Sequence, residues 1–322
     1  MDKIKTANFL IKLESLGLLD SRLNFVRNNN ELVLLSGGSN NYVYEMEDSS
    51  GKKYAAKVVS LGLKKERYRE IEEAVRVQDL LSEKSPNIQK VVAVITLTAS
   101  FNEMLELLSA KRVHTDKIED YDGTIIQIII TEELRKIKYI DNNERLKSEE
   151  EIVEFAKQIG NALLVVHDNN YMHRDIKPDN ILWDDENKIY KLSDFDNAAH
   201  IDKKLIKYVG TKGYMAPEIW KHEKSGYDKT ADIYSLGCTM EKLTRGKTIS
   251  KGLKRLIAKM KKYDNKARYQ SIEEVLKELD RIEKTPELDT MAAEEADIGN
   301  VTITETTVDE TMTYRTTMME NP

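Results

Sequence analysis

Residues 171–180 read YMHRDIKPDN, a decapeptide with more polar chemistry than a buried core accepts. It places one histidine, one arginine, two aspartates, one lysine and one asparagine within ten positions. Charged groups are buried only when they are paired or hydrogen-bonded. The pattern therefore predicts a functional loop and not a core element.

The composition is that of a globular protein without a basic face. The chain has 322 residues, is 40% hydrophobic and carries a formal charge of −6, so it can bury a core but is not expected to bind nucleic acid. One cysteine, Cys238, excludes an internal disulfide framework and is typical of a reducing compartment. We expect a cytoplasmic location, with an effector injected into a host cell as the alternative.

The N-terminal stretch NFLIKLESLGLL (residues 8–19) is interrupted by Lys12 and Glu14. This interruption favours an amphipathic helix over a signal peptide or a membrane span, and no later segment is longer or more apolar. We predict a helical N-terminal extension over residues 1–29. The polar run RNNN (residues 27–30) is interpreted as a hinge into the next unit.

The next part of the chain has the texture of strands followed by one helix. Short β-branched or aromatic runs predict strands at ELVLLS (31–36), YVYEME (42–47), KYAAKVV (53–59), VVAVITL (91–97) and TIIQIIIT (124–131). The first three are expected to pair antiparallel. Residues 64–81 predict a surface helix whose buried stripe comprises Ile71, Ala74, Val75 and Leu81.

After residue 134 the periodicity becomes helical. Ser148 and Glu151 form a capping box at the start of a predicted helix over residues 149–167, and Ser271 and Glu274 open another that ends near Lys284. Strands first and helices afterwards predict two lobes with a cleft between them. Residues 101–123 are interpreted as an insertion with a short helix, and residues 285–322 as a disordered acidic tail with ten threonines.

Residues 173–180, HRDIKPDN, resemble the catalytic loop of the eukaryotic-type serine/threonine protein kinases. The resemblance implies the α+β, bilobal protein-kinase fold, with an antiparallel β-sheet and one main helix in the N-lobe and a mostly helical C-lobe. It places the kinase domain at residues 30–284, with the N-lobe at 30–132 and the C-lobe at 135–284. The member is compact and divergent, because the region from residue 246 to 268 is short.

The same resemblance assigns the catalytic and metal-binding roles. It implies that Asp175 accepts the proton of a substrate hydroxyl, that Lys177 approaches the γ-phosphate, and that Asn180 and Asp194 hold Mg²⁺, with Mn²⁺ as a substitute. In LSDFDNAA (192–199), Asp196 stands where the family usually has glycine. We infer a stiffer loop there, with metal binding by Asp194 preserved.

The nucleotide site is implied by further matches in the strand half. Lys57 resembles the lysine that binds the α- and β-phosphates of ATP, and Glu73 is the predicted partner that holds it. The glycine-rich loop departs from the family, because Ser36 and Asn41 occupy positions where glycine is usual. The predicted ATP-binding residues are Ser36, Gly37, Gly38, Asn41, Val43, Ala55, Lys57, Thr131, Glu132, Leu134 and Leu182.

VGTKGYMAPEIW (209–220) resembles the end of a kinase activation segment. The resemblance implies that Thr211 touches Asp175 and Lys177, and that Glu218 pairs with Arg268. It also implies that Asp232 is a buried anchor and that His173 packs on Phe195. Between Asp194 and Thr211 there is no serine or threonine, and only Tyr208 could be phosphorylated. We therefore expect the segment to adopt its working form without phosphothreonine.

These residues predict an ATP-dependent protein serine/threonine kinase that acts on a protein substrate and phosphorylates its own tail. A phosphothreonine-reading domain is a predicted partner of the tail segment TETTVDET (304–311). The first alternative is a pseudokinase or scaffold that binds nucleotide weakly, favoured by the altered glycine loop and by Asp196. A small-molecule phosphotransferase is the second alternative, but it has no use for a peptide-facing segment such as GTKGYMAPE (210–218).

Overall fold

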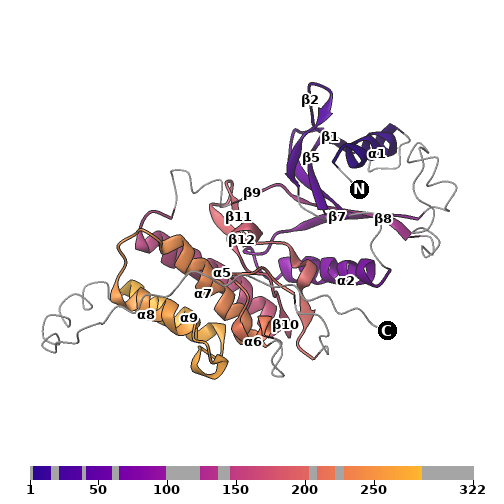
Figure 1. Ribbon diagram of the computed structural model, residues 1–322. Coiled ribbons are helices and arrows are strands. Elements are labelled where there is room, and N and C mark those ends of the chain that lie inside the picture. Colours follow the sequence, from indigo (N-terminus) through magenta and orange to yellow (C-terminus); the bar gives the residue numbers. More distant parts are fainter. Residues whose placement is uncertain are drawn as a thin grey trace, which may run out of the picture.

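The computed structural model has two lobes of different architecture, as predicted (Figure 1). An antiparallel sheet with α1 and α2 forms the N-terminal lobe, and α5 to α9 dominate the C-terminal lobe. The structure describes residues 3–15, 22–37, 41–59, 65–98, 124–136, 146–202, 209–221 and 228–284.

The N-terminal lobe is built on one sheet, in which all neighbouring strands run antiparallel. In the described part of the chain the sheet has six strands in the order β1-β5-β6-β8-β7, and β4 pairs with β5 off this path. The strands are β1 (Leu23–Phe25), β4 (Leu34–Gly37), β5 (Asn41–Asp48), β6 (Lys53–Val59), β7 (Val91–Thr98) and β8 (Thr124–Glu132). Four of the five predicted strand runs are therefore confirmed, whereas ELVLLS (31–36) is divided between β3 (Glu31–Leu32) and β4.

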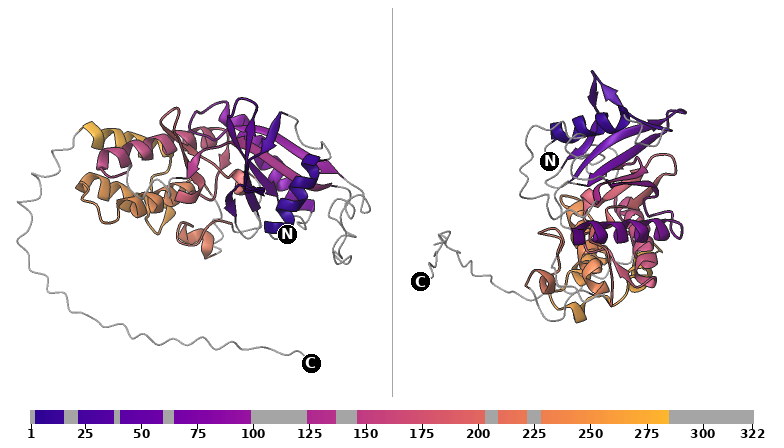
Figure 2. Two further views of the ribbon diagram at one scale, coloured as in Figure 1. Left: turned by 90° about the horizontal axis from the view of Figure 1, so that it is seen from above. Right: turned by 90° about the vertical axis from the view of Figure 1, so that its right-hand side faces the viewer.

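Helices α1 (Lys3–Ser15) and α2 (Lys65–Ser82) lie on opposite faces of this sheet (Figures 1 and 2). Successive side chains of β8 point to opposite faces, so Ile128 and Ile130 pack in the cluster with α1, and Ile129 packs in the cluster with α2. The predicted stripe of α2 is confirmed, because its four residues are at most 6% exposed. Strand β8 is thus buried on both faces, which explains why TIIQIIIT does not alternate between apolar and polar residues and has only Gln127 as a polar residue between its two threonines.

The prediction of a helical extension through residue 29 is wrong for residues 23–28, where the structure has two short strands. The helix ends at Ser15, and Leu23 and Phe25 bury one face of β1 against the sheet, while Asn24 between them is exposed. This period of two is a strand signal, but three residues are too few to stand out from sequence.

The run RNNN is a turn and not a hinge. Strands β2 (Arg27–Asn28) and β3 (Glu31–Leu32) pair with Arg27 opposite Leu32, which leaves Asn29 and Asn30 as a two-residue loop. Both asparagines have positive φ, at 49° and 66°. Two-residue hairpin loops favour this left-handed geometry, which asparagine tolerates better than most residues.

The C-terminal lobe packs its helices around one core. The helices are α5 (Glu149–Asp168), α6 (Pro217–Trp220), α7 (Lys229–Thr244), α8 (Lys251–Met260) and α9 (Ile272–Lys284). The predicted capping box of α5 is present, with the Glu151 amide donating to the Ser148 hydroxyl and the Glu151 carboxylate accepting from the Ser148 amide. The predicted end of α9 at Lys284 is confirmed as well.

Short strands and turns between α5 and α6 carry the functional loops. These strands are β10 (Tyr171–Met172), β11 (Ile181–Asp184), β12 (Ile189–Leu192) and β13 (Ala199–His200), with the 3-10 turns η2 (Pro178–Asn180) and η3 (Phe195–Asn197) between them. Strand β9 (Arg135–Lys136) precedes α5 and pairs with β11, and the 3-10 turn η4 (Asn265–Ala267) precedes α9. The segment after α2 connects the N-terminal lobe to β12 of the C-terminal lobe. The Leu192 amide donates to the Asn87 carbonyl, and the Leu192 carbonyl accepts from the Gln89 amide.

Several predictions lie outside the described residues: the helix in the 101–123 insertion, the 285–322 tail, Gly38 and Tyr208. No helix in the described part of the chain is long and apolar enough to cross a membrane.

Candidate active site

Asp175 is the centre of a compact hydrogen-bonded cluster. Its Oδ1 accepts from the Thr211 hydroxyl at 2.7 Å, and its Oδ2 accepts from Lys177 Nζ at 2.8 Å and from Asn180 Nδ2 at 3.0 Å. Lys177 Nζ also donates to Thr211 Oγ1 at 2.7 Å, so the predicted contact of Thr211 with both residues is confirmed. A 7% exposed carboxylate with three fixed donors has a single orientation.

Buried Asp232 of α7 fixes the backbone of the catalytic loop. Its Oδ2 accepts from the His173 amide at 2.9 Å, and its Oδ1 accepts from the Arg174 amide at 2.8 Å. Burial raises the pKa of Asp232, but the hydrogen bond from His167 and these amides outweigh burial and lower it. Arg174 has φ of 68°, a left-handed geometry that the two fixed amides hold in place.

His173 and Phe195 form the predicted buried contact, edge to face with ring centroids 4.7 Å apart. The Asp175 amide donates to His173 Nδ1 at 3.3 Å, so this nitrogen is an acceptor, and Nε2 then carries the proton facing the Ser193 carbonyl at 3.0 Å. His173 therefore links the segment of Asp175 to the segment of Asp194.

The two predicted metal ligands flank the β11–β12 hairpin at its open end, with Asn180 just before β11 and Asp194 shortly after β12. Ile181 pairs with Leu192, and the Asn180 carbonyl accepts from the amide and the hydroxyl of Ser193 at 2.9 and 3.0 Å. This pairing brings Asn180 beside the segment that carries Asp194. A carboxylate and an amide oxygen are hard ligands that suit Mg²⁺ together with phosphate oxygens, so these residues fit a metal–nucleotide complex.

Lys57 lies between two carboxylates. Its Nζ donates to Asp194 Oδ1 at 2.8 Å and to Asp196 Oδ2 at 2.7 Å. Burial lowers the pKa of Lys57, but the attraction of the two carboxylates outweighs burial and raises it above its ordinary value. Burial raises the pKa of Asp194, and the attraction of Lys57 outweighs this and lowers it.

Glu73, the predicted partner of Lys57, is an exposed residue of α2. The structure brings Lys57 to Asp194 and Asp196, and the pairing with Glu73 stays a prediction. Asp196 was singled out in the sequence because it replaces the usual glycine, but its contact with Lys57 was not predicted. The two residues are 139 positions apart, and no local pattern reports a contact at that separation.

Three of the predicted ATP-binding residues, Val43, Ala55 and Thr131, lie on neighbouring strands. Val43 pairs with Lys57 across β5 and β6, and Ala55 pairs with Thr131 across β6 and β8. Thr131 Oγ1 accepts from Gln89 Nε2 at 3.0 Å. The structure places the other predicted residues of this set as follows: Ser36 and Gly37 at the end of β4, Asn41 at the start of β5, Glu132 at the end of β8, Leu134 in the connection to β9, and Leu182 in β11.

Lys191 was not predicted, although it links the end of β8 in the N-terminal lobe to β11 in the C-terminal lobe. Its Nζ lies 2.8 Å from Glu132 Oε1 and 2.9 Å from Asp184 Oδ2. Burial raises the pKa of Asp184, but hydrogen bonds from Asn187 and Lys191 lower it to about 2. A lysine inside the apolar run IYKL (189–192) was the available signal, because buried lysines are almost always paired.

Glu218 and Arg268 form the predicted pair, with Arg268 Nη1 and Nη2 donating to the two carboxylate oxygens at 2.7 Å each. Arg268 also donates to the carbonyls of Lys262, Thr230 and Tyr263. Arg268 is 2% exposed, and these five contacts occupy all five N–H donors of its guanidinium. The pair ties the end of the activation segment to the helical core.

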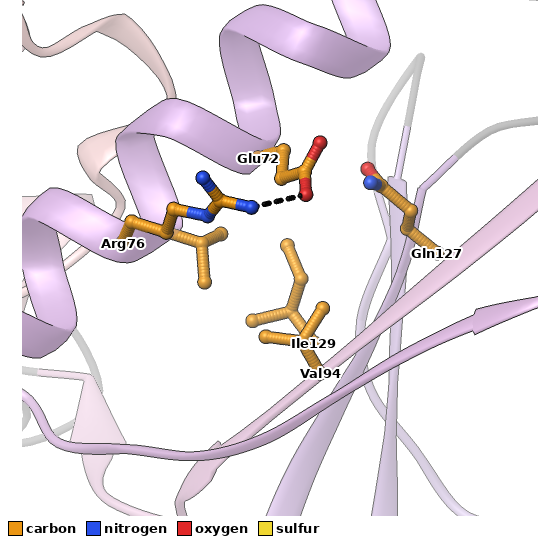
Figure 3. A pocket seen from close by; sticks show the side chains of 6 residues that line it. Glu72, Arg76, Val94, Gln127 and Ile129 are labelled. Carbon is orange, nitrogen blue, oxygen red and sulfur yellow. Dashed lines mark hydrogen bonds and ion pairs between the residues drawn. The ribbon is translucent and has the colours of Figure 1, made fainter.

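A separate cavity of about 210 Å³ lies between α2 and strands β7 and β8, and none of the predicted site residues lines it (Figure 3). Its lining comprises Glu72, Val75, Arg76, Val94, Gln127 and Ile129. The amide of Gln127 is turned toward α2, and its buried Oε1 has no hydrogen-bond partner among the described residues. A buried acceptor without a partner destabilises the fold.

Comparisons with known proteins agree with this geometry. A family model described as protein kinase domain matches residues 30–319. Human mitogen-activated protein kinase kinase kinase 5 is 43% identical over 106 residues, which are 32% of this chain and 8% of that protein. Human mitogen-activated protein kinase 13 is 34% identical over 135 residues, which are 41% of this chain and 34% of that protein. The bovine phosphorylase b kinase gamma catalytic chain of liver and testis is 34% identical over 137 residues, 40% of this chain and 34% of that protein. The similarity thus spans about a third or less of these relatives.

Proposed function

The chain belongs to the protein kinase family, and on that premise we propose that it transfers the γ-phosphoryl group of ATP to serine or threonine hydroxyls of a protein. The observation that carries the proposal is the cluster of Asp175, Lys177, Asn180 and Thr211 beside the Lys57 and Asp194 pair. A protein without phosphoryl transfer has no need to hold all these groups in one place. We place it in the cytoplasm because Cys238 is a buried free thiol.

The residues divide the chemistry between them. Bound ATP with Mg²⁺ supplies the transferable group, and the metal offsets charge on the phosphate oxygens. Asp175 accepts the proton of the incoming hydroxyl and orients it, using lone pairs that its three donors leave open. Lys177 places positive charge beside that oxygen, and Lys57 binds phosphate oxygens. Asn180 and Asp194 would hold the metal.

Serine or threonine specificity is supported by Lys177, which bridges Asp175 and Thr211 next to the position of the acceptor. The test is transfer of radiolabelled phosphate from ATP to a generic protein, followed by analysis of the phosphorylated amino acid. We expect phosphoserine and phosphothreonine, with transfer abolished by Asp175→Asn and by Lys57→Ala. Transfer that survives Asp175→Asn, or label found on tyrosine alone, would refute the assignment.

The pseudokinase alternative is favoured by the altered glycine loop, with Ser36 and Asn41 where glycine is usual, and by Asp196 in place of glycine. A pseudokinase would bind nucleotide without transferring phosphate. The same assay separates the two, because a wild-type chain that binds ATP but labels no protein, itself included, would be the scaffold.

We assign the threonine-rich tail as an internal substrate, although residues 285–322 lie outside the described part of the chain. The intact mass of the wild-type protein should exceed that of Asp175→Asn by multiples of a phosphate group. Phosphorylation of TETTVDET would create a site for a phosphothreonine-reading domain. Equal masses would end both ideas. A phosphate on Tyr208 that activity requires would contradict activation without modification.

A further inference from the structure

The Lys57 ammonium shares its donors between two carboxylates of one short segment. Asp194 Oδ1 and Asp196 Oδ2 lie 2.8 and 2.7 Å from Nζ, and the Lys57 side chain is only 18% exposed. An ammonium group has three N–H donors. Two are directed at the aspartates, which leaves the third for a phosphate oxygen.

Asp194 cannot be the permanent partner of Lys57, because it is also the predicted metal ligand. A divalent cation draws the carboxylate toward itself and weakens its bond to an ammonium. Asp196 has no such second duty in the predicted chemistry. It is therefore the carboxylate that can keep hold of Lys57 while Asp194 holds the metal.

The turn η3 that carries Asp196 is fixed by the residues on either side of Asp196. Phe195 is 1% exposed and packs on His173, and the Asn197 carbonyl accepts from Arg174 Nε at 2.5 Å. Helix α2 packs against the same turn. Asp196 is not among the residues with positive φ, so an aspartate fits here without the freedom that glycine provides.

We propose that Asp196 is a positioning residue that holds Lys57 for the nucleotide phosphates, the role that the sequence assigned to Glu73. The proposal rests on the proposed function only in naming ATP as the ligand. A flexible lysine that Asp196 already holds loses less conformational freedom when it meets a phosphate. Electrostatic repulsion acts in the opposite direction, because a second carboxylate close to the phosphates repels them. The two effects predict shifts of opposite sign when the charge is removed.

The experiment measures binding to the full chain by isothermal titration calorimetry, with Mg²⁺ and adenylyl imidodiphosphate as one ligand and adenosine as the other. Asp196→Asn removes the charge and keeps the shape. Loss of one charge-assisted contact should weaken binding of the phosphate-bearing ligand about tenfold. Adenosine has no phosphates, so its affinity should stay within about twofold, which also shows that the variant is folded.

Two further comparisons show whether Asp196 acts through Lys57. In a Lys57→Met background, Asp196→Asn should cause no additional loss, because the interaction is already gone. Asp196→Glu retains a carboxylate and should recover most of the affinity. The matched control is Asp202→Asn, which removes the same charge from an 86% exposed side chain of the same segment and should leave both affinities unchanged.

Unchanged or tighter binding of the phosphate-bearing ligand by Asp196→Asn would overturn the proposal, as would losses that add in the double variant. Equal weakening of adenosine would also overturn it, since that result indicates a general structural defect. Binding needs no phosphoryl transfer. If the variants show the expected pattern of affinities but the wild type transfers no phosphate, the role of Asp196 stands and the proposed function fails. If the wild type binds neither ligand, both the role of Asp196 and the proposed function fail.

Discussion

Thr211 offers a sharp test of the catalytic cluster, because one hydroxyl joins two charged groups. It donates to Asp175 Oδ1 and accepts from Lys177 Nζ, each at 2.7 Å. Thr211→Val replaces the hydroxyl by a methyl group of similar size and removes both contacts. The direct contact of Lys177 with Asp175 at 2.8 Å remains, so the cluster loosens but does not fall apart.

The expected loss follows from the hydrogen bonds removed. A hydrogen bond to a charged group contributes about 1.5–3 kcal/mol. Since the lysine retains its carboxylate partner, we expect the loss of about one such contact in the transition state. This corresponds to a fall of about 10- to 100-fold in kcat/KM. The loss should lie in kcat, because Thr211 makes its contacts with Asp175 and Lys177 and not with the predicted ATP-binding residues.

The assay compares the initial rates of phosphate transfer by the wild type, Thr211→Val and Thr211→Ser. Serine keeps the hydroxyl and loses only a methyl group, so it should remain within about threefold of the wild type. Thermal melting checks that each variant is folded. A valine variant with unchanged kcat would refute the role of the hydroxyl. A serine variant as slow as valine would show that methyl packing, and not hydrogen bonding, is what matters.

Four further predictions concern stability. Glu218→Ala leaves the buried guanidinium of Arg268 without its carboxylate and should lower the free energy of unfolding in urea by about 3–5 kcal/mol. Replacing both residues by apolar ones should lower it by far less than the sum of the two single losses. The pKa of Asp184 is about 2 in the folded protein against an ordinary value of 3.8. Its carboxylate therefore stabilises the fold above about pH 4, and this contribution is lost as the pH falls through the folded pKa. In urea titrations, Asp184→Asn should be about 2 kcal/mol less stable than the wild type near pH 6, and the difference should disappear toward pH 2. Gly237→Ala places a Cβ 2.9 Å from the Cβ of a methionine in α8 and should lower the melting temperature by an amount equivalent to about 1–3 kcal/mol. Gln127→Leu removes the unpartnered buried oxygen and should raise the melting temperature by about 2–4 °C, and a lower value would mean that this oxygen has a partner in solution.

The elements that could be predicted from the sequence are those whose signal is local. The capping box of α5 lies within four positions, and the buried stripe of α2 follows from helical spacing. The motif matches also predicted two contacts between distant residues, Thr211 with Asp175 and Glu218 with Arg268. Those contacts were predictable because the resemblance carries information about pairing that spacing alone lacks.

What the sequence could not provide depends on tertiary pairing. Strand β1 forms because the segment with Leu23 and Phe25 pairs with β5. A three-residue pattern does not indicate such a pairing. The turn at Asn29 and Asn30 was interpreted as a hinge because the strands on either side of it are only two residues long. Such short elements are stabilised by their neighbours, so local propensity does not reveal them.

Asp196 shows how one departure from a family pattern can be neutral for the backbone and consequential for charge. As a missing glycine it suggested only a stiffer loop, and the backbone there indeed needs no left-handed residue. As a carboxylate it lies 2.7 Å from Lys57. The turn that carries it is also held by Arg174, whose Nε donates to the Asn197 carbonyl. The family resemblance implies that Arg174 would pair with an activating phosphothreonine, and the chain has no serine or threonine between Asp194 and Thr211 to carry one. The Asn197 carbonyl and the Asp196 carboxylate therefore give the turn η3 two contacts, to Arg174 and to Lys57, and neither contact requires a modification.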